Sequence, residues 1–382
     1  MVPVVLDRRS FVYGMAGLTG TIVLQTPFTP LRSAPAAKSG NPDDVFFIDG
    51  QGGPFDDEEE VAAVWPKARR EELKRSGMSA WMVTINDVTA VHEAWDNTIR
   101  KMSHYEALIA ANPDLFILAR TAADIRAAKT VGKVALIFGT ENTTMLEPDL
   151  DKVRVMADLG IRVVQLTYNI RNMSGDGALE PANGGISNFG RDMIARIEKE
   201  RLLLDLSHGG EKTITDAVAA AKRPMSINHT GCKALADHPR NVTDTAIKAV
   251  ADKGGVIGIY FMPYLTPGRT PTRDDVIEHL NHAVNVGGED HVAIGTDNSL
   301  NAMPNDEKTR EQWHEVYRQR VANGNAAPGE NPDFFPAVPD YNSPMRFHLL
   351  ADDLGRRGWK AQKIEKILGA NLLRLYDAAW RD

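Results

Sequence analysis

The stretch Leu202–Asn241, LLLDLSHGGEKTITDAVAAAKRPMSINHTGCKALADHPRN, holds two short apolar runs that each end at a histidine. The first run ends at Asp205-Leu-Ser-His208 and the second at Asn228-His229, with an Ala-rich segment of helical composition between them. Two buried strands joined by one helix form a parallel βαβ unit, which places both imidazoles at the same strand ends. That edge of a parallel sheet or barrel is where active sites form.

Further apolar runs alternate with helical segments on both sides of this unit. From eight of nine such runs we expect a single-domain (β/α)8 barrel of the TIM type with elaborated loops, in which Leu115–Ala119 is the supernumerary strand. The nine runs are Val45–Gly50, Ala80–Ile85, Leu115–Ala119, Val134–Gly139, Arg162–Thr167, Leu202–Leu206, Met225–Asn228, Gly255–Tyr260 and Val292–Asp297.

Three segments fall outside this alternation. The Gly-rich stretch Asn172–Phe189 predicts a long loop, a kind of segment that is often functional. The stretch Asn298–Ser343 is rich in Pro, Asn, Gly and charge and predicts an elaborated loop over the barrel mouth. A disordered insertion is the alternative there, and the aromatic residues in the stretch favour ordered packing. Ala361–Ala379 predicts one amphipathic helix.

Composition excludes several classes of protein. The net charge of −7 arises from mixed signs without a basic stripe, which argues against a nucleic-acid partner. Cys232 is the single cysteine of the 382 residues, so neither an intramolecular disulfide nor a Cys-rich zinc site is possible. Any metal ion must therefore be held by histidine and carboxylate side chains.

The N-terminus has the pattern of an export signal. Arg8-Arg9 precedes an apolar, Gly-containing stretch over Tyr13–Leu24, and Ala34-Pro-Ala36 resembles a cleavage site. We expect residues 1–36 to be a twin-arginine signal peptide, the Tat export machinery to be a partner, and residues 37–382 to form a periplasmic metallohydrolase domain. An N-terminal membrane anchor is the alternative, although the apolar stretch is shorter than the roughly 20 residues that a span needs.

Polar residues follow the predicted strands at the positions expected of a catalytic site, namely Glu141, Tyr168, His208, His229 and Asp297. Two histidines and one carboxylate suit a zinc ion that keeps an open position for water or substrate. A separate aspartate can then move the proton. Each residue also has a structural explanation, because a carboxylate can begin a helix, an Asp-Asn-Ser run can form a turn, and a buried histidine can simply be hydrogen-bonded.

Five motifs resemble those of the renal (membrane) dipeptidase family, from about Ile48 to Tyr376. They are His229-Thr-Gly-Cys-Lys-Ala-Leu-Ala-Asp-His-Pro-Arg240-Asn241-Val-Thr-Asp244, Asp205-Leu-Ser-His208, Leu166-Thr-Tyr-Asn169, Ile294-Gly-Thr-Asp297 and Lys366-Ile-Leu-Gly-Ala-Asn371. The resemblance implies a barrel metallopeptidase of the amidohydrolase type in which a glutamate bridges two zinc ions. It also implies that the chain forms a homodimer, as family members commonly do.

The resemblance implies a role for each matching residue. Glu141 takes the bridging position, and His208 and His229 are the other ligands of one zinc ion. Asp297 is the catalytic acid and base. Arg240 grips the terminal carboxylate of a dipeptide, for which a planar guanidinium is well suited.

Two further positions concern the substrate. Asn241, beside the guanidinium residue, is expected to help bind it. Tyr168 stands where family members have a histidine that contacts the scissile carbonyl, and its phenol can donate a hydrogen bond to a developing oxyanion. Tyr168 is thus expected both to bind substrate and to assist catalysis.

The sequence departs from the family where an HxD pair holds the other zinc ion. Gln51, a poor zinc ligand, and Gly53, which offers none, occupy those two positions. Asp49, Asp56 or Asp57 could serve as a substitute ligand only from a different sequence position than the family's HxD pair, and this difference in position disfavours such a role. We therefore expect one zinc ion, with the second site lost.

Three functions are compatible with these residues. The first is an exported zinc hydrolase that cleaves the amide bond of a dipeptide or small dipeptide-like compound. The second is a catalytically degenerate relative that serves as a binding or accessory protein, which the lost ligands favour and the surviving ones disfavour. The third is a mononuclear deacylase or lactonase, which shares the metal chemistry.

Overall fold

The computed structural model describes residues 45–54, 64–88, 93–322, 324 and 326–381. The expected signal peptide over residues 1–36 lies outside this part of the chain, as do Asp56 and Asp57. None of the helices in the described ranges has both the length and the apolar character needed to cross a bilayer.

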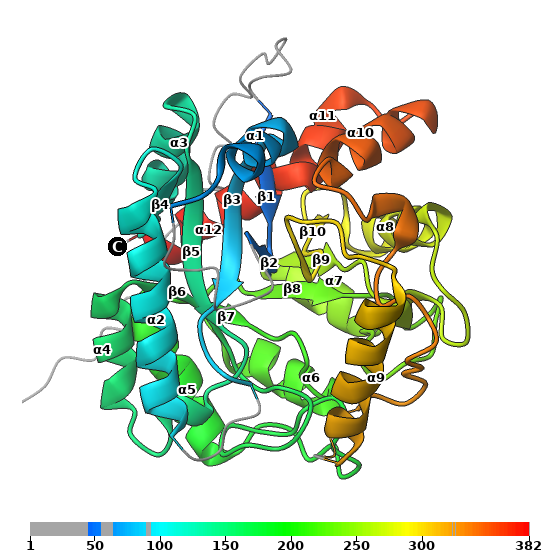
Figure 1. Ribbon diagram of the computed structural model, residues 1–382. Helices are drawn as coiled ribbons and strands as arrows, with labels where there is room; N and C mark the ends of the chain where they lie inside the picture. Colours follow the sequence, from blue (N-terminus) through cyan, green and yellow to red (C-terminus); the bar gives the residue numbers. More distant parts are fainter. Residues whose placement is uncertain (1–44, 55–63, 89–92, 323, 325, 382) are drawn as a thin grey trace, which may run out of the picture. The chain divides into compact units, whose positions relative to one another are not determined.

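The described strands form a nearly closed parallel barrel, which confirms the predicted (β/α)8 fold (Figure 1). The backbone N–H of Gly50 donates to the carbonyl of Ile294 at 2.9 Å and so links the ends of the first and last strands. Strand β4 (Phe116–Leu118) pairs with β5 outside the ring, as expected of the supernumerary run. The barrel strands in spatial order are β1 (Phe47–Asp49), β3 (Met78–Thr84), β5 (Val134–Thr140), β6 (Ile161–Gln165), β7 (Leu203–Asp205), β8 (Ser226–Thr230), β9 (Val256–Ile259) and β10 (Val292–Ile294).

Helices surround this barrel because each presents an apolar face to the strands. On α5 (Asn188–Lys199), for example, Met193, Ile194 and Ile197 are buried at helical spacing. The other surrounding helices are α1 (Lys67–Ser76), α2 (Ala94–Ala111), α3 (Ala122–Thr130), α4 (Asp151–Leu159), α6 (Glu211–Ala220), α7 (Asp244–Asp252), α8 (Arg273–Gly287) and α10 (Arg346–Arg356). Short 3-10 turns are η3 (Thr144–Leu146), η4 (Pro263–Leu265) and η5 (Pro339–Tyr341).

Apolar side chains fill the end of the barrel opposite the predicted site. Helix α12 (Asn371–Trp380) packs against β7, β9, β10 and α3. Its buried Leu372, Leu375 and Tyr376 belong to one apolar cluster with inward residues of the strands, among them Val163 and Leu203. The polar residues that follow the strands are thereby confined to the other rim.

The C-terminal segment is not the single helix that the pattern predicts. Helix α11 (Ala361–Glu365) passes through a π-helical turn, η6 (Lys366–Ala370), before α12 begins. Gly369 has non-helical torsion angles, and a Cβ atom there would lie 2.2 Å from the carbonyl oxygen of Phe46. The helix is interrupted because the β1 backbone approaches it so closely.

The elaborated loop predicted over Asn298–Ser343 contains regular secondary structure that was not predicted. This stretch contains β11 (Asn298–Ser299), which pairs with β2 (Gly52–Gly53), and the 16-residue helix α9 (Glu307–Ala322). No residue of α9 is buried, so most of its positions are polar and the apolar periodicity that reveals other helices is weak.

Backbone packing at β8 depends on two glycines. A Cβ atom on Gly295 would lie 1.9 Å from the carbonyl oxygen of Asn228, and one on Gly258 would lie at the same distance from the same atom. Gly295→Ala must therefore displace β8, and we expect it to lower the free energy of unfolding by about 1–3 kcal/mol. Thermal and denaturant unfolding measure this change.

Gly355→Ala is the matched control. Gly355 lies in α10, where a Cβ atom would meet no other atom within 4 Å, and alanine is favoured over glycine in helices by up to about 1 kcal/mol. Equal unfolding midpoints for the two variants would contradict this account of β8.

Candidate active site

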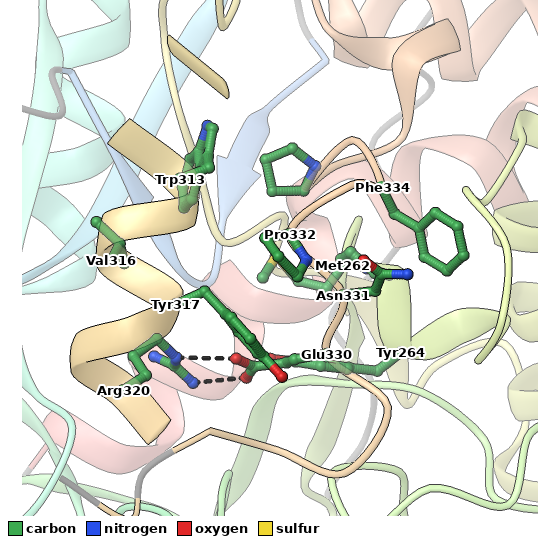
Figure 2. A pocket seen from close by; sticks show the side chains of 12 residues that line it. Met262, Tyr264, Trp313, Val316, Tyr317, Arg320, Glu330, Asn331, Pro332 and Phe334 are labelled. Atoms are coloured by element: carbon green, nitrogen blue, oxygen red, sulfur yellow. Dashed lines mark hydrogen bonds and ion pairs between the residues drawn. The ribbon is translucent and has the colours of Figure 1, made fainter. Parts of the chain in front are cut away.

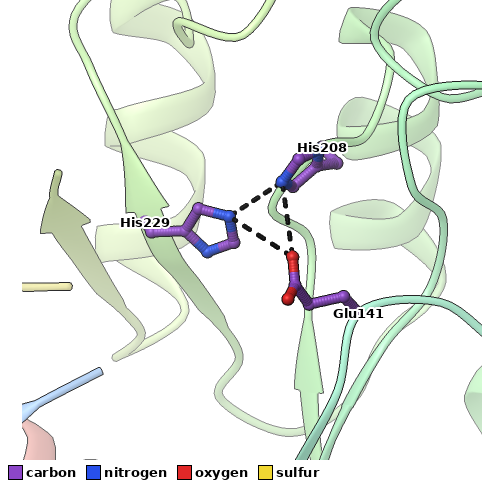
Figure 3. Close-up of side chains that lie close together, drawn as sticks. All are labelled: Glu141, His208 and His229. Atoms are coloured by element: carbon purple, nitrogen blue, oxygen red, sulfur yellow. Dashed lines mark hydrogen bonds and ion pairs between the residues drawn. The ribbon is translucent and has the colours of Figure 1, made fainter. Parts of the chain in front are cut away.

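Glu141, His208 and His229 come together at the carboxyl ends of β5, β7 and β8 (Figure 3). The two imidazole Nε2 atoms lie 2.8 Å apart. Glu141 Oε2 lies 3.7 Å from Nε2 of His208 and 4.0 Å from Nε2 of His229. All three side chains are buried, and one potential ligand atom from each lies within 4.8 Å of the others. The structure thus gathers the three residues that the sequence nominated as ligands.

Two asparagines set the tautomers of these histidines. His208 Nδ1 lies 2.7 Å from Asn169 Oδ1, and His229 Nδ1 lies 2.5 Å from Asn228 Oδ1. Because an amide oxygen only accepts hydrogen bonds, each Nδ1 carries the hydrogen. Each neutral ring therefore presents the lone pair of its Nε2 to the centre of the site.

Opposed lone pairs repel unless a cation neutralises them. Burial and the nearby Arg240 guanidinium hold the pKa of both imidazoles well below its ordinary value, which disfavours a proton as that cation. Two imidazole nitrogens and a carboxylate oxygen are the ligands that a divalent ion such as zinc accepts. The donor set fits a metal ion.

The two oxygens of Glu141 have different surroundings. Oε1 accepts hydrogen bonds from Thr84 Oγ1 at 2.6 Å and from Gln51 Nε2 at 3.0 Å, whereas Oε2 faces the imidazoles. Gln51 Nε2 also donates to Thr84 Oγ1 at 2.8 Å. Burial, followed by the charge of Asp297, raises the pKa of Glu141 to about 7. A positive charge beside Oε2 would counteract both effects.

Two of the site residues have left-handed backbone conformations. His208 and Asp297 each have φ of 59°, a region that non-glycine residues occupy at a cost on the order of 1–3 kcal/mol. The N–H of Asp297 donates to the carbonyl of Gln51 at 2.8 Å, which helps to hold this conformation. Strain of this kind concentrates at functional sites.

Charged groups surround Asp297. Removal from water raises the pKa of its carboxyl group, while Arg240 and Arg320 act in the opposite direction. Arg240 is only 3% exposed, and its guanidinium carbon lies 5.9 Å from the centre of the Tyr260 ring. The site thus places a buried cation and a carboxylate beside the ligand cluster.

Tyr168 and Asn241 have different surroundings. The Tyr168 ring stacks on that of His208 with centroids 4.1 Å apart, and removal from water raises the pKa of its hydroxyl to about 12. Asn241 donates its amide hydrogens to the carbonyls of Ala236 and Tyr264, both at 2.9 Å. A direct contact of Asn241 with substrate stays a prediction, and these bonds give it a role in positioning the loop.

Sequence reasoning missed several contributors to the site, namely Thr84, Asn169, Asn228 and Arg320. Arg320 of α9 hydrogen-bonds Tyr168, and nothing in the irregular composition of that segment pointed to it. Asn169 belongs to the Leu166–Asn169 motif, but the sequence analysis gave it no role. Its position next to Tyr168, which follows a predicted strand, could have indicated a place in the site.

Residues 55–315 match the family model described as membrane dipeptidase (peptidase family M19). The chain belongs to the membrane dipeptidase family. Family members are metal-dependent hydrolases, and this chain retains three residues able to hold an ion.

Individual relatives agree with this membership. The chain is similar to the dipeptidase tcpJ of Claviceps purpurea, with 29% identity over 243 residues that cover 60% of this chain and 56% of that protein. It is also similar to the dipeptidase verJ of Clonostachys rogersoniana, with 25% identity over 76% of this chain and 67% of the relative. The chain thus spans between about half and two thirds of the length of these curated relatives.

A solved structure matches over nearly its whole length. An amidohydrolase from Pseudomonas aeruginosa superposes with a TM-score of 0.76 and 29% identity, covering 88% of this chain and 97% of that one. The similarity in fold to this amidohydrolase therefore extends beyond residues 55–315 to most of the chain.

The asparagine at the rear of His208 offers a test of the ligand geometry. Asn169→Ala removes the acceptor that fixes the tautomer and orientation of His208, so we expect zinc affinity to fall by about 10–100-fold. Competition with a chromophoric chelator measures the affinity. Asn188→Ala, at an exposed position of α5, is the control, and equal affinities of the two variants would refute the role of Asn169.

Proposed function

We propose that this protein is a zinc-dependent hydrolase that cleaves the amide bond of a dipeptide or a small dipeptide-like compound, with one zinc ion. The proposal rests on one observation. The Nε2 atoms of His208 and His229 lie 2.8 Å apart beside a carboxylate oxygen of Glu141, and neither nitrogen carries a hydrogen. Zinc bound there would lower the pKa of a bound water and polarise the substrate carbonyl.

The other site residues supply acid–base chemistry. Asp297 lies at the end of β10 beside the ligand cluster, with its pKa raised by removal from water. A carboxylate with a raised pKa is a better proton acceptor, and once protonated it can deliver the proton to the leaving amine. Tyr168, whose pKa of about 12 keeps it protonated at neutral pH, can donate a hydrogen bond to the developing oxyanion.

Arg240 fits the role of a carboxylate anchor. Its guanidinium is enclosed and electrostatically coupled to Asp297, His208 and His229, so it lies within range of the reacting groups. A planar, permanently charged group of this kind binds a carboxylate through two parallel hydrogen bonds. This favours a substrate with a free carboxyl terminus over a lactone.

Gln51 supports the use of a single ion. Its amide nitrogen donates to Glu141 Oε1, the oxygen that a second ion would share in a bridged pair. The amide hydrogens carry positive charge, so they favour the ionised carboxylate as a cation would, but they repel a metal ion. With Gly53 at the other family position, Glu141 would hold an ion through Oε2.

Restoring the family pair tests this substitution. We expect Gln51→His combined with Gly53→Asp to raise the zinc content from about one to about two ions per chain, measured by elemental analysis after dialysis. Gln51→Leu is the control, since it removes the amide donor without supplying a ligand, and its content should stay near one. Two ions per chain in the unchanged protein would overturn the single-metal proposal.

Hydrolysis is tested with a panel of dipeptides and N-acylated amino acids. Asp297→Asn should lower kcat by at least about 100-fold, the usual contribution of a general acid or base, while zinc content is retained. A zinc-loaded protein that cleaves no member of the panel would favour the accessory-protein reading. Cleavage restricted to acylated amino acids would favour a deacylase.

Export to the periplasm through the twin-arginine pathway is also part of the proposal. It rests on the Arg8-Arg9 pattern and the apolar stretch that follows. Replacement of both arginines by lysine should leave the protein in the cytoplasmic fraction, as measured by cell fractionation. Unchanged periplasmic recovery of that variant would contradict this route.

A further inference from the structure

We propose that a cavity lined by Arg320, which contacts Tyr168 of the site, binds an aromatic side chain of the substrate, so that the enzyme prefers dipeptides that carry one. This inference rests on the proposed function and names its substrate class. The cavity has a volume of about 150 Å³ and lies between helix α9 and the segments around Tyr264 and Pro332 (Figure 2).

One wall is a face of α9. Trp313, Val316, Tyr317 and Arg320 follow one another at intervals of three, one and three residues, which places them on the same side of a helix. Figure 2 shows Trp313, Tyr317 and the Arg320 guanidinium on the cavity side of the helix, and Val316 also lines the cavity. No residue of α9 is buried, and the side chain of Val316 is 42% exposed. The apolar face of this helix therefore lines an open cavity and does not pack against the hydrophobic core.

The opposite wall is also largely apolar. Met262 and Pro332 lie across the cavity from the helix, and Phe334 also lines it (Figure 2). Rings and a thioether offer flat, polarisable contacts, and aromatic pairs contribute about 0.5–1.5 kcal/mol beyond the area that they bury. Such walls select a planar apolar group.

The charged groups of the cavity neutralise one another. Arg320 donates to Glu330 through two nitrogens at 2.7 and 3.1 Å, and the Tyr264 hydroxyl donates to the same carboxylate at 2.5 Å. A charged occupant would have to break this ion pair, whereas an uncharged one leaves it intact. The occupant should therefore be neutral.

Two wall residues connect the cavity to the catalytic groups. Arg320 hydrogen-bonds Tyr168, whose ring stacks on His208. On the other side, Tyr264 stacks on His238 with centroids 4.5 Å apart, and His238 Nδ1 accepts the backbone N–H of Arg240 at 3.1 Å. These contacts place the cavity two side chains from His208 on one side and two from Arg240 on the other. The side chain of a substrate held between the ligands and Arg240 is the group that we propose to enter it.

The volume matches this occupant. An apolar cavity of about 150 Å³ in another protein is known to hold benzene, so the present cavity accommodates a phenyl ring. A methyl group would leave most of the space unfilled. Discrimination between such groups in an apolar pocket amounts to about tenfold or more.

Calorimetric titration of the zinc-loaded full protein with three phosphinate dipeptide analogues tests the proposal. One analogue carries methyl groups on both residues, and the others carry a benzyl group on the first or on the second residue. One benzyl analogue should bind at least about tenfold more tightly than the methyl analogue. The same benzyl position should be preferred in kcat/KM with the corresponding dipeptides.

A filled cavity and a matched control complete the experiment. Val316→Trp places a ring in the cavity and should reduce the ratio of benzyl to methyl affinity to about one. Val321→Trp, on the same helix at a position 53% exposed and outside the cavity lining, should keep the ratio of the unchanged protein.

The outcomes separate the two proposals. Binding of all three analogues with equal affinity, or an unchanged ratio in Val316→Trp, would overturn the aromatic cavity and leave the proposed function standing. Failure of every analogue to bind, together with an inactive dipeptide panel, would overturn the proposed function and this inference with it.

Discussion

The opposition of two hydrogen-free imidazole nitrogens is the interaction on which the site depends. The orientation of each imidazole depends on an asparagine, because the Oδ1 atom of Asn169 or Asn228 accepts a hydrogen bond from the Nδ1 atom of that ring. Asn228 is in turn held by the backbone of β8, whose carbonyl leaves no room for a side chain at Gly258 or Gly295. The tautomer of His229 therefore depends on strand packing and that of His208 on Asn169 in the loop after β6, so a metal ion would find its donors already oriented.

A second constraint is the balance of charge in a site removed from water. Glu141 and Asp297 raise each other's energy when both are ionised, and Arg240 offsets only part of this repulsion. Hydrogen bonds from Thr84 and Gln51 stabilise the ionised Glu141 without adding a full charge. One divalent ion would complete this balance, as proposed, whereas a second would face the amide hydrogens of Gln51.

The barrel and the ligand cluster could be predicted from sequence because both follow from strands. Buried parallel strands are continuous apolar runs, and whatever follows them lies on one rim, so His208 and His229 had to be neighbours. The role of Gln51 could not be predicted, since its partner Glu141 is 90 residues away along the chain. Similarly, Gly369 interrupts its helix because of Phe46, a contact that no local pattern encodes.

Helix α9 was not predicted because none of its residues is buried, and the same property affects the site. A helix without buried residues gains little stability from the core, so its position depends on a few contacts at its inner face. The ion pair of Arg320 with Glu330 and the bond of Arg320 to Tyr168 are such contacts, and both border the cavity. An apolar group that entered the cavity would add buried area to this same face, so the proposed substrate binding would stabilise the helix that lines the cavity. Because Arg320 also contacts Tyr168, the cavity and the Tyr168 hydroxyl, to which we assign the oxyanion, are linked through one side chain.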